Sequence, residues 1–232
     1  MTISERFADI KRRKDEAAVR SGRNPEDITL LAVTKTHGAE EINQAISAGA
    51  TDIGENRVQE FLEKYPQVNP VRWHLIGHLQ TNKVKSVVGK VVMIHSVDSV
   101  RLAREIDKRS GAAGLTTDIL IEINSAMEES KSGINPKDLR QTVEEIVAEC
   151  AHVRIRGLMC IPPIAADPED ARPYFKEAAA LFNEMKGWSL PRDRFLPDVL
   201  SMGMSGDFEA AIEEGATIVR VGSSIFGQRN YR

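Results

Sequence analysis

Eight short runs rich in β-branched residues alternate with eight longer helical patterns along this chain of 232 residues. The predicted strands are bounded by polar residues, Gly or Pro, and they cover residues 28–34, 51–54, 71–76, 91–95, 118–124, 153–160, 196–201 and 216–222. The predicted helices cover residues 3–21, 39–48, 56–64, 80–88, 98–110, 136–150, 167–186 and 206–214. Because each helix supplies the long crossover that a parallel neighbouring strand needs, the alternation predicts a parallel sheet.

The number of units favours a closed barrel over an open sheet. Eight strand–helix units in 232 residues fit a (β/α)₈ barrel, which usually has about 250 residues. A doubly wound open sheet is the alternative, but no glycine-rich dinucleotide fingerprint follows the first predicted strand. We therefore predict an α/β protein with one domain over residues 1–232, a TIM barrel with an extra N-terminal helix at residues 3–21.

Composition excludes several classes of protein. A chain with 41% hydrophobic residues, 28% charged residues and a net charge of -3 is typical of a globular protein and gives no support for a nucleic-acid partner. No apolar stretch approaches the roughly 20 residues that span a bilayer, and the first residues lack the apolar region of a secretory signal. We expect a cytoplasmic protein with no membrane partner.

Lys35 directly follows the first predicted strand, at residues 28–34. In a (β/α)₈ barrel the functional site is assembled at the carboxyl ends of the strands, so a lysine there points its amine into the pocket. A desolvated amine is a candidate for covalent chemistry with an aldehyde. A surface position is the alternative for any single lysine at a strand end.

Two loops rich in Gly and Ser follow the last two predicted strands, at residues 201–206 and 221–227. The loops after strands seven and eight are the recurrent phosphate site of these barrels, and the natural contacts here are Ser201, Gly222 and Ser223. Strand eight pairs with strand one in a closed barrel, which brings these loops beside Lys35. A phosphorylated aldehyde would be held at one end and bonded to an amine at the other, and pyridoxal 5'-phosphate has that geometry.

Arg220 lies within the predicted strand 216–222 and Glu122 within 118–124. A guanidinium that faces the barrel interior must find a carboxylate, a phosphate or a ring acceptor, because it cannot lose its proton. Alternation along a strand does not decide which face Arg220 occupies. A ligand contact and an internal ion pair with Glu122 both remain open.

The histidines suggest a competing interpretation as metal ligands, with His74, His78 and His95 near Asp98. Successive residues of a strand point to opposite faces, so His74 and His78 need not converge, and no acidic ligand motif accompanies them. Cys150 and Cys160 also lack a metal-ligand spacing. We predict no metal site.

Six blocks of sequence in one order resemble the family of pyridoxal phosphate homeostasis proteins and, more distantly, the barrel domain of alanine racemase. The blocks are residues 31–35, 54–60, 73–80, 157–159, 200–207 and 219–223. The resemblance runs over essentially the whole chain and implies that pyridoxal 5'-phosphate is the cofactor. It further implies a Schiff base at Lys35, a pyridine-nitrogen contact at Arg220 and additional cofactor contacts at Asn56, Ser201, Met202, Gly222 and Ser223.

The resemblance implies a carrier that sequesters and delivers the cofactor in vitamin B6 homeostasis, with effects on amino-acid and keto-acid metabolism. An arginine beside the ring nitrogen leaves that nitrogen largely unprotonated, which weakens the electron sink that many transformations use. Transient contact with apoenzymes that depend on pyridoxal phosphate is the expected interaction. We expect a monomer.

The alternative is an amino-acid racemase that uses pyridoxal phosphate, in which case the protein is an enzyme. The racemase carries a tyrosine four residues after its lysine, where this chain has Ala39. The racemase also has a second domain that supplies another acid–base tyrosine, and we expect no such domain after the eighth strand. Two-sided proton transfer would therefore lack one of its bases, although a weak activity of this type stays open. A metal-dependent barrel hydrolase is the most distant alternative.

Overall fold

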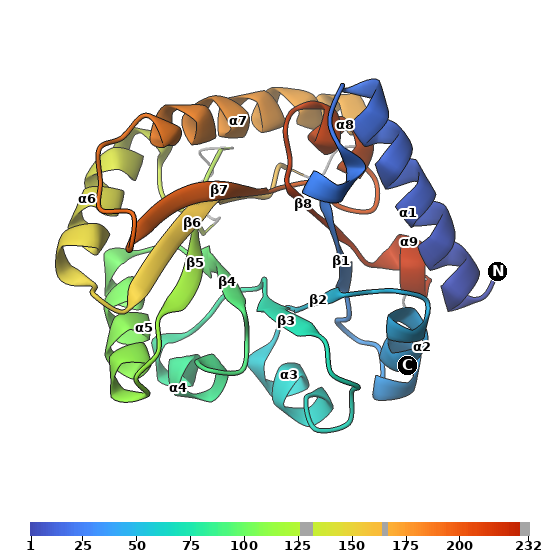
Figure 1. Ribbon diagram of the computed structural model, residues 1–232, viewed down its shortest axis with the longest axis horizontal. Coiled ribbons are helices and arrows are strands. Elements are labelled where there is room, and N and C mark those ends of the chain that lie inside the picture. The colour runs from blue at the N-terminus through green and yellow to red at the C-terminus, as the bar shows by residue number, and fades with distance from the viewer. Residues whose placement is uncertain (126–131, 164–166, 228–232) are drawn as a thin grey trace.

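Eight parallel strands close into a barrel in the computed structural model (Figure 1), which describes residues 1–125, 132–163 and 167–227. The strands are β1 (Thr29–Val33), β2 (Asp52–Glu55), β3 (Arg72–Leu75), β4 (Met93–Val97), β5 (Thr117–Ile123), β6 (Val153–Cys160), β7 (Phe195–Ser201) and β8 (Ile218–Val221). Strand β1 pairs with both β2 and β8, so the sheet has no free edge. The predicted barrel is confirmed, and the open sheet is excluded.

Helices follow the strands in the expected order. They are α2 (Ala39–Ser47), α3 (Val58–Lys64), α4 (Val84–Val87), α5 (Val100–Ala112), α6 (Leu139–Glu149), α7 (Arg172–Lys186) and α8 (Phe208–Glu213). Short 3₁₀ turns precede three of them, at η2 (Thr81–Lys83), η3 (Pro136–Asp138) and η4 (Pro168–Ala171), and a further turn, η1 (Pro25–Asp27), precedes β1. Proline fits the first position of such turns because its missing N–H would have no partner there.

The N-terminal helix α1 (Ile3–Arg20) completes the outer ring of helices. The helix that follows β8, α9 (Ser223–Phe226), has only four residues and was not predicted. Helix α1 packs beside α8 and α9 (Figure 1), where Arg6 donates hydrogen bonds to the carbonyl oxygens of Ile225 and Phe226. Arg13 of α1 also forms an ion pair with Glu209 of α8. The extra helix thus covers the part of the barrel that α9 is too short to cover.

Strand β4 begins two residues later than predicted and continues two residues further. The sequence placed it at residues 91–95, whereas the strand covers Met93–Val97. Val92 is 45% exposed, so this apolar residue does not belong to the core although its residue type suggested a buried strand. The polar residues His95 and Ser96 belong to the strand, and both are buried with hydrogen-bond partners.

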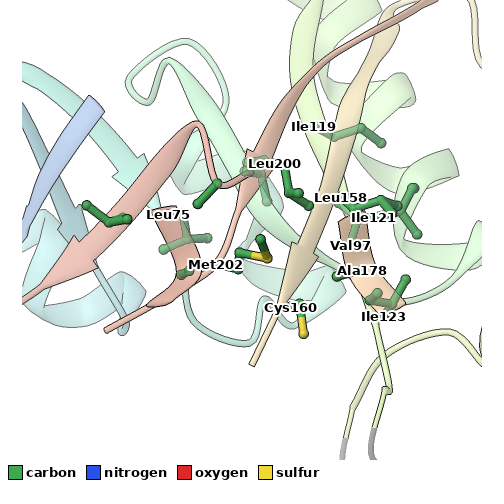
Figure 2. Close-up of a cluster of buried hydrophobic side chains, with 14 of the residues drawn as sticks. Leu75, Val97, Ile119, Ile121, Ile123, Leu158, Cys160, Ala178, Leu200 and Met202 are labelled. Atoms are coloured by element: carbon green, nitrogen blue, oxygen red, sulfur yellow. The ribbon is translucent and has the colours of Figure 1, made fainter. Parts of the chain in front are cut away.

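Apolar side chains form two separate cores. The larger one lies between the strands and the helices, and Figure 2 shows part of it, including side chains of strands β3 to β7 and Ala178 of α7. The smaller one fills the barrel interior and consists of Leu31, Val33, Ile76, Met93, Leu120, Met159, Val199 and Ile218. In β1, successive residues from Leu30 to Val33 alternate between these two cores, as the period of two requires.

Gly157 allows β6 to approach β7 closely, and its replacement should destabilise the barrel. Its φ is +139°, and an added Cβ would lie 2.0 Å from the carbonyl oxygen of Val199. We expect Gly157→Ala to lower the free energy of unfolding by about 2–5 kcal/mol, since backbone strain and steric overlap add. Urea denaturation measures this. Gly206→Ala, where a Cβ meets nothing within 4 Å, is the control, and equal stability of the two variants would contradict the prediction.

No helix in the described ranges is both long enough and apolar enough to cross a membrane.

Candidate functional site

A cavity of about 430 Å³ opens at the carboxyl ends of the strands. Five of the seven predicted site residues line it, namely Lys35, Asn56, Arg220, Gly222 and Ser223. Other residues that line it include His37, Met204, Ser205 and Gly206. The closed barrel therefore brings residues from the first strand and from the last two strands to one cavity.

Lys35 lies in a tight turn after β1 that a side-chain carboxylate helps to hold in place. The next residue, Thr36, has a φ of +68°, which is uncommon for a residue other than glycine. Its N–H donates a hydrogen bond of 2.8 Å to the Glu60 carboxylate. That contact holds Thr36 in an unfavourable conformation in the turn between Lys35 and His37, which both line the cavity.

A buried network around Lys64 supports this turn. The Lys64 amine lies 2.9 Å from the carbonyl oxygen of Thr34, 2.8 Å from the Glu55 carboxylate and 2.9 Å from the Glu60 carboxylate. Burial alone would raise the pKa of Glu60, but hydrogen bonds from Thr36 and Lys64 outweigh it and lower that pKa. We refer to Thr34, Glu55, Glu60 and Lys64 as the Lys64 network.

The same network also fixes Asn56, which lines the cavity directly after β2. The Glu55 carboxylate accepts the Asn56 backbone N–H at 2.9 Å and the Thr34 hydroxyl at 2.9 Å. The Asn56 side chain lines the cavity, and its Oδ1 atom is buried without a hydrogen-bond partner. A buried polar atom of this kind needs a partner, and the cavity is where a ligand would supply one.

Arg220 lies in the cavity wall with its guanidinium almost fully buried. One Nη atom donates to the Ser201 hydroxyl at 2.7 Å, and the other donates to the carbonyl oxygen of Cys160 at 2.9 Å. Glu122 accepts a hydrogen bond from Ser132, and among the described residues it forms no ion pair with Arg220. Burial raises the pKa of Glu122. The internal Arg220–Glu122 pair is therefore not formed, and Arg220 faces the cavity.

The loops after β7 and β8 contact each other at the edge of the cavity. The Ser205 hydroxyl oxygen accepts the Gly222 N–H at 3.1 Å and the Ser224 N–H at 3.4 Å. Since this oxygen accepts both bonds, its own hydrogen is available to donate. A Cβ at Gly222 would lie 3.3 Å from the carbonyl oxygen of Val33, so the position favours glycine.

Ser201 and Met202 do not line the cavity, although both were predicted to contact the cofactor. Ser201 is fully buried behind Arg220, and its hydroxyl lies 3.0 Å from Nδ1 of His95. The Met202 side chain belongs to the larger core outside the barrel (Figure 2). Gly203, with a φ of +89°, then turns the loop so that Ser205 reaches the cavity. Ser205 was not among the predicted site residues because the sequence does not show where this turn lies.

The histidines do not form a metal site. His78 is exposed and lies 3.5 Å from Asp98, whereas His74 is buried and bonded to Asp52 and His95. In the part of the chain that the structure describes, no group of three or more His, Cys, Asp or Glu side chains is arranged to hold a metal ion. His37 reaches the cavity and stacks on Phe226, with 4.8 Å between ring centroids.

Barrel and site together define a protein of the alanine racemase N-terminal type, and the model of the family "Alanine racemase, N-terminal domain" matches residues 15–230. The pyridoxal phosphate homeostasis protein of Aquifex aeolicus is 45% identical over 236 residues, which cover 100% of both chains. The protein of that name from Escherichia coli K12 is 40% identical and covers 99% of this chain and 97% of its own. The chain therefore belongs to the alanine racemase N-terminal domain family and, within it, to the pyridoxal phosphate homeostasis proteins.

Solved structures agree with this assignment. PipY of Synechococcus elongatus with pyridoxal phosphate (PLP) bound is 34% identical, has a TM-score of 0.79, and covers 97% of this chain and 100% of its own. The same protein without PLP has a TM-score of 0.84. An alanine racemase from Streptomyces lavendulae shares the fold, with a TM-score of 0.73, 19% identity and 58% of its own chain covered.

Proposed function

We propose that this protein binds pyridoxal 5'-phosphate in the cavity, holds it through a Schiff base on Lys35, and acts in vitamin B6 homeostasis by sequestering and delivering the cofactor. The observation that carries the proposal is the meeting of three kinds of group in one cavity. They are the Lys35 amine, the paired loops around Ser205 and Gly222, and the Arg220 guanidinium. The bound cofactor of PipY, which is 34% identical to this chain, supports the same assignment.

The residues present fit this cofactor. The loops around Ser205 and Gly222 offer hydroxyl and backbone donors to a phosphate, at the place where barrels of this type usually bind one. Asn56 has a buried oxygen without a partner, and the cofactor would lie against it. We propose direct phosphate contacts from the hydroxyl groups of Ser205 and Ser223, with Gly222 leaving room for the phosphate and Ser201 acting behind Arg220 instead.

When bound, the cofactor would supply an aldehyde that condenses reversibly with an amine with loss of water, and the Lys35 amine is the group that would hold it. Arg220 donates a hydrogen bond to the ring nitrogen and, because a guanidinium keeps its proton, it leaves that nitrogen without one. This arrangement suits holding and releasing the cofactor better than stabilising a carbanion.

A racemase activity remains the second candidate, because the alanine racemase family shares this barrel. Helix α2 begins at Ala39, where the racemase carries its tyrosine, and no tyrosine is among the described residues that line the cavity. We propose that the chain is not an enzyme. Incubation of the loaded protein with L-alanine, followed by chiral chromatography, tests this, and sustained formation of the D-isomer would refute it.

The covalent attachment is tested by adding pyridoxal phosphate, reducing with borohydride and digesting the product for mass spectrometry. The cofactor mass should appear on the peptide that contains Lys35. We further propose that the protein acts in the cytoplasm as a monomer and makes transient contacts with apoenzymes. Size-exclusion chromatography tests the monomer, and transfer of the cofactor to a purified apoenzyme tests delivery.

Replacing Ser205 should weaken cofactor binding through the phosphate. Ser205→Ala removes one hydrogen bond to a charged group, which contributes about 1.5–3 kcal/mol. We expect the dissociation constant for pyridoxal phosphate to rise by about 10- to 100-fold, and the affinity for pyridoxal, which lacks the phosphate, to stay unchanged. Ser4→Ala, an exposed position on α1, is the control. Equal losses for both ligands would place Ser205 away from the phosphate.

A further inference from the structure

Five buried polar side chains form one continuous chain of hydrogen bonds through the barrel interior. Nε2 of His74 lies 2.9 Å from Oδ1 of Asp52, and Nδ1 of His74 lies 2.9 Å from Nε2 of His95. Nδ1 of His95 lies 3.0 Å from the Ser201 hydroxyl, which accepts a bond of 2.7 Å from Arg220. We call Asp52, His74, His95 and Ser201 the cross-barrel chain.

The cross-barrel chain occupies space that such barrels usually fill with Val, Ile and Leu. Its members come from β2, β3, β4 and β7. Strands β4 and β7 are not neighbours in the sheet, so the bond between His95 and Ser201 crosses the interior. Each of these side chains is at least 95% buried. Burying polar groups is costly unless each is bonded, and this chain ends at Arg220, in the cavity wall.

With both imidazoles neutral, the two ends of the cross-barrel chain fix the direction of every bond in it. Arg220 only donates, and the Asp52 carboxylate only accepts. Burial would raise the pKa of Asp52, but bonds from His74, Arg72 and Thr51 hold it at about 2. His74 therefore donates from Nε2 to Asp52 and accepts at Nδ1.

His95 must then donate from Nε2 to His74 and accept at Nδ1 from the Ser201 hydroxyl. Burial lowers the pKa of His95 well below its ordinary value and the nearby Arg220 charge lowers it further, which agrees with a neutral ring. The Ser201 oxygen is left to accept from Arg220. Both imidazoles thus carry their hydrogen on Nε2.

We propose that the cross-barrel chain is a positioning device that aims the Arg220 guanidinium at the ring nitrogen of the bound cofactor. The inference rests on the proposed function, because it names the same cofactor. With Ser201 and the Cys160 carbonyl each taking one Nη atom, the guanidinium plane is fixed. The hydrogen bonds in the barrel interior then determine the direction of the remaining N–H groups of Arg220. His74 and His95 are therefore positioning residues.

The first test needs no cofactor. In the wild-type protein at neutral pH, ¹⁵N NMR of the imidazole rings should find His74 and His95 neutral, with the hydrogen on Nε2 in both. A hydrogen on Nδ1 of either ring, or a charged His95, would overturn the assigned direction. This measurement stands even where a variant fails to fold.

The second test compares two ligands in two variants. His95→Leu breaks the cross-barrel chain, and Met93→Leu, an interior position on the same strand that lies outside it, is the matched control. We expect His95→Leu to weaken pyridoxal phosphate binding by about tenfold. Binding of the analogue with a ring C–H in place of the nitrogen should change by less than twofold, since that ring makes no bond with Arg220.

The outcomes separate the inference from the proposed function. Equal losses for both ligands in His95→Leu, or no loss for either, would overturn the positioning role of His95. A wild-type protein that binds neither ligand would refute the proposed function instead. A matching loss of pyridoxal phosphate affinity in Met93→Leu would attribute the effect to packing and overturn the inference as well.

Discussion

Lys35→Ala should abolish covalent attachment of pyridoxal phosphate while part of the non-covalent binding remains. Lys35 is the only lysine among the described residues that line the cavity, so no other amine there replaces it. The loops around Ser205 and Gly222 stay intact in this variant, and they should retain the phosphate. Borohydride reduction followed by intact-protein mass spectrometry measures the attachment, and the expected incorporation falls from about one cofactor per chain to none.

Lys83→Ala is the matched control for this experiment. Lys83 lies with Asn56 in a smaller depression next to the cavity, so its amine is close to the site without lining it. Incorporation in Lys83→Ala should equal that of the wild type. If Lys35→Ala were labelled as fully as the wild type, the Schiff base would belong to another residue. If Lys35→Ala also lost all affinity for the phosphate, the proposed binding of the cofactor at two separate points, Lys35 and the phosphate loops, would be wrong.

Lys64→Met should destabilise the fold strongly, because it leaves a buried carboxylate without its partner. Glu55 is fully buried and only 9% of the Lys64 surface is exposed, and their charged atoms lie 2.8 Å apart. Removing one member of such a pair costs about 3–5 kcal/mol. Urea denaturation should show a loss of free energy of unfolding in that range. Lys85→Met, on the exposed face of α4, should change it by less than about 0.5 kcal/mol.

A double variant tests the reason for that loss. Adding Glu55→Gln to Lys64→Met removes the unpaired charge, so stability should recover in part. The Thr36 contact with Glu60 would persist, yet the carbonyl oxygen of Thr34 would still lack its bond from Lys64. We therefore expect slower Schiff-base formation at Lys35 even after stability is regained. A double variant that is less stable than Lys64→Met alone would show that the charge is not the cause.

The barrel could be predicted because it depends on a local and repeated signal. Each strand is a short β-branched run and each helix has a 3.6-residue period, so their order was visible in the sequence. The predicted ends of β4 were wrong because residue type does not report burial here. The apolar Val92 is exposed and lies outside the strand, whereas the polar Ser96 is buried and lies within it. Helix α9 was missed because four residues are too few to show a period.

The predicted site residues differ in how directly the sequence reports on them. Lys35, Gly222 and Ser223 follow strands immediately, so the strand assignment alone places them at the cavity. The role of Ser201 depends on His95, which is 106 residues away in the chain and lies across the barrel. No local pattern encodes such a pair. Side chains alternate between the two faces of a strand, but this alternation does not say which face points into the barrel. It therefore did not show that these side chains point inward.

Helix α1 has a consequence for the order in which this protein folds. Its partners α8 and α9 belong to the last quarter of the described chain, and Arg6 reaches Ile225 across 219 residues. During synthesis the helix leaves the ribosome first, but the surface that receives it is completed last. Contacts of α1 with α2 can form early, but the part of its surface that packs against α8 and α9 must remain uncovered until the end of the chain has been made. The first segment to be made thus completes its native contacts only with the last.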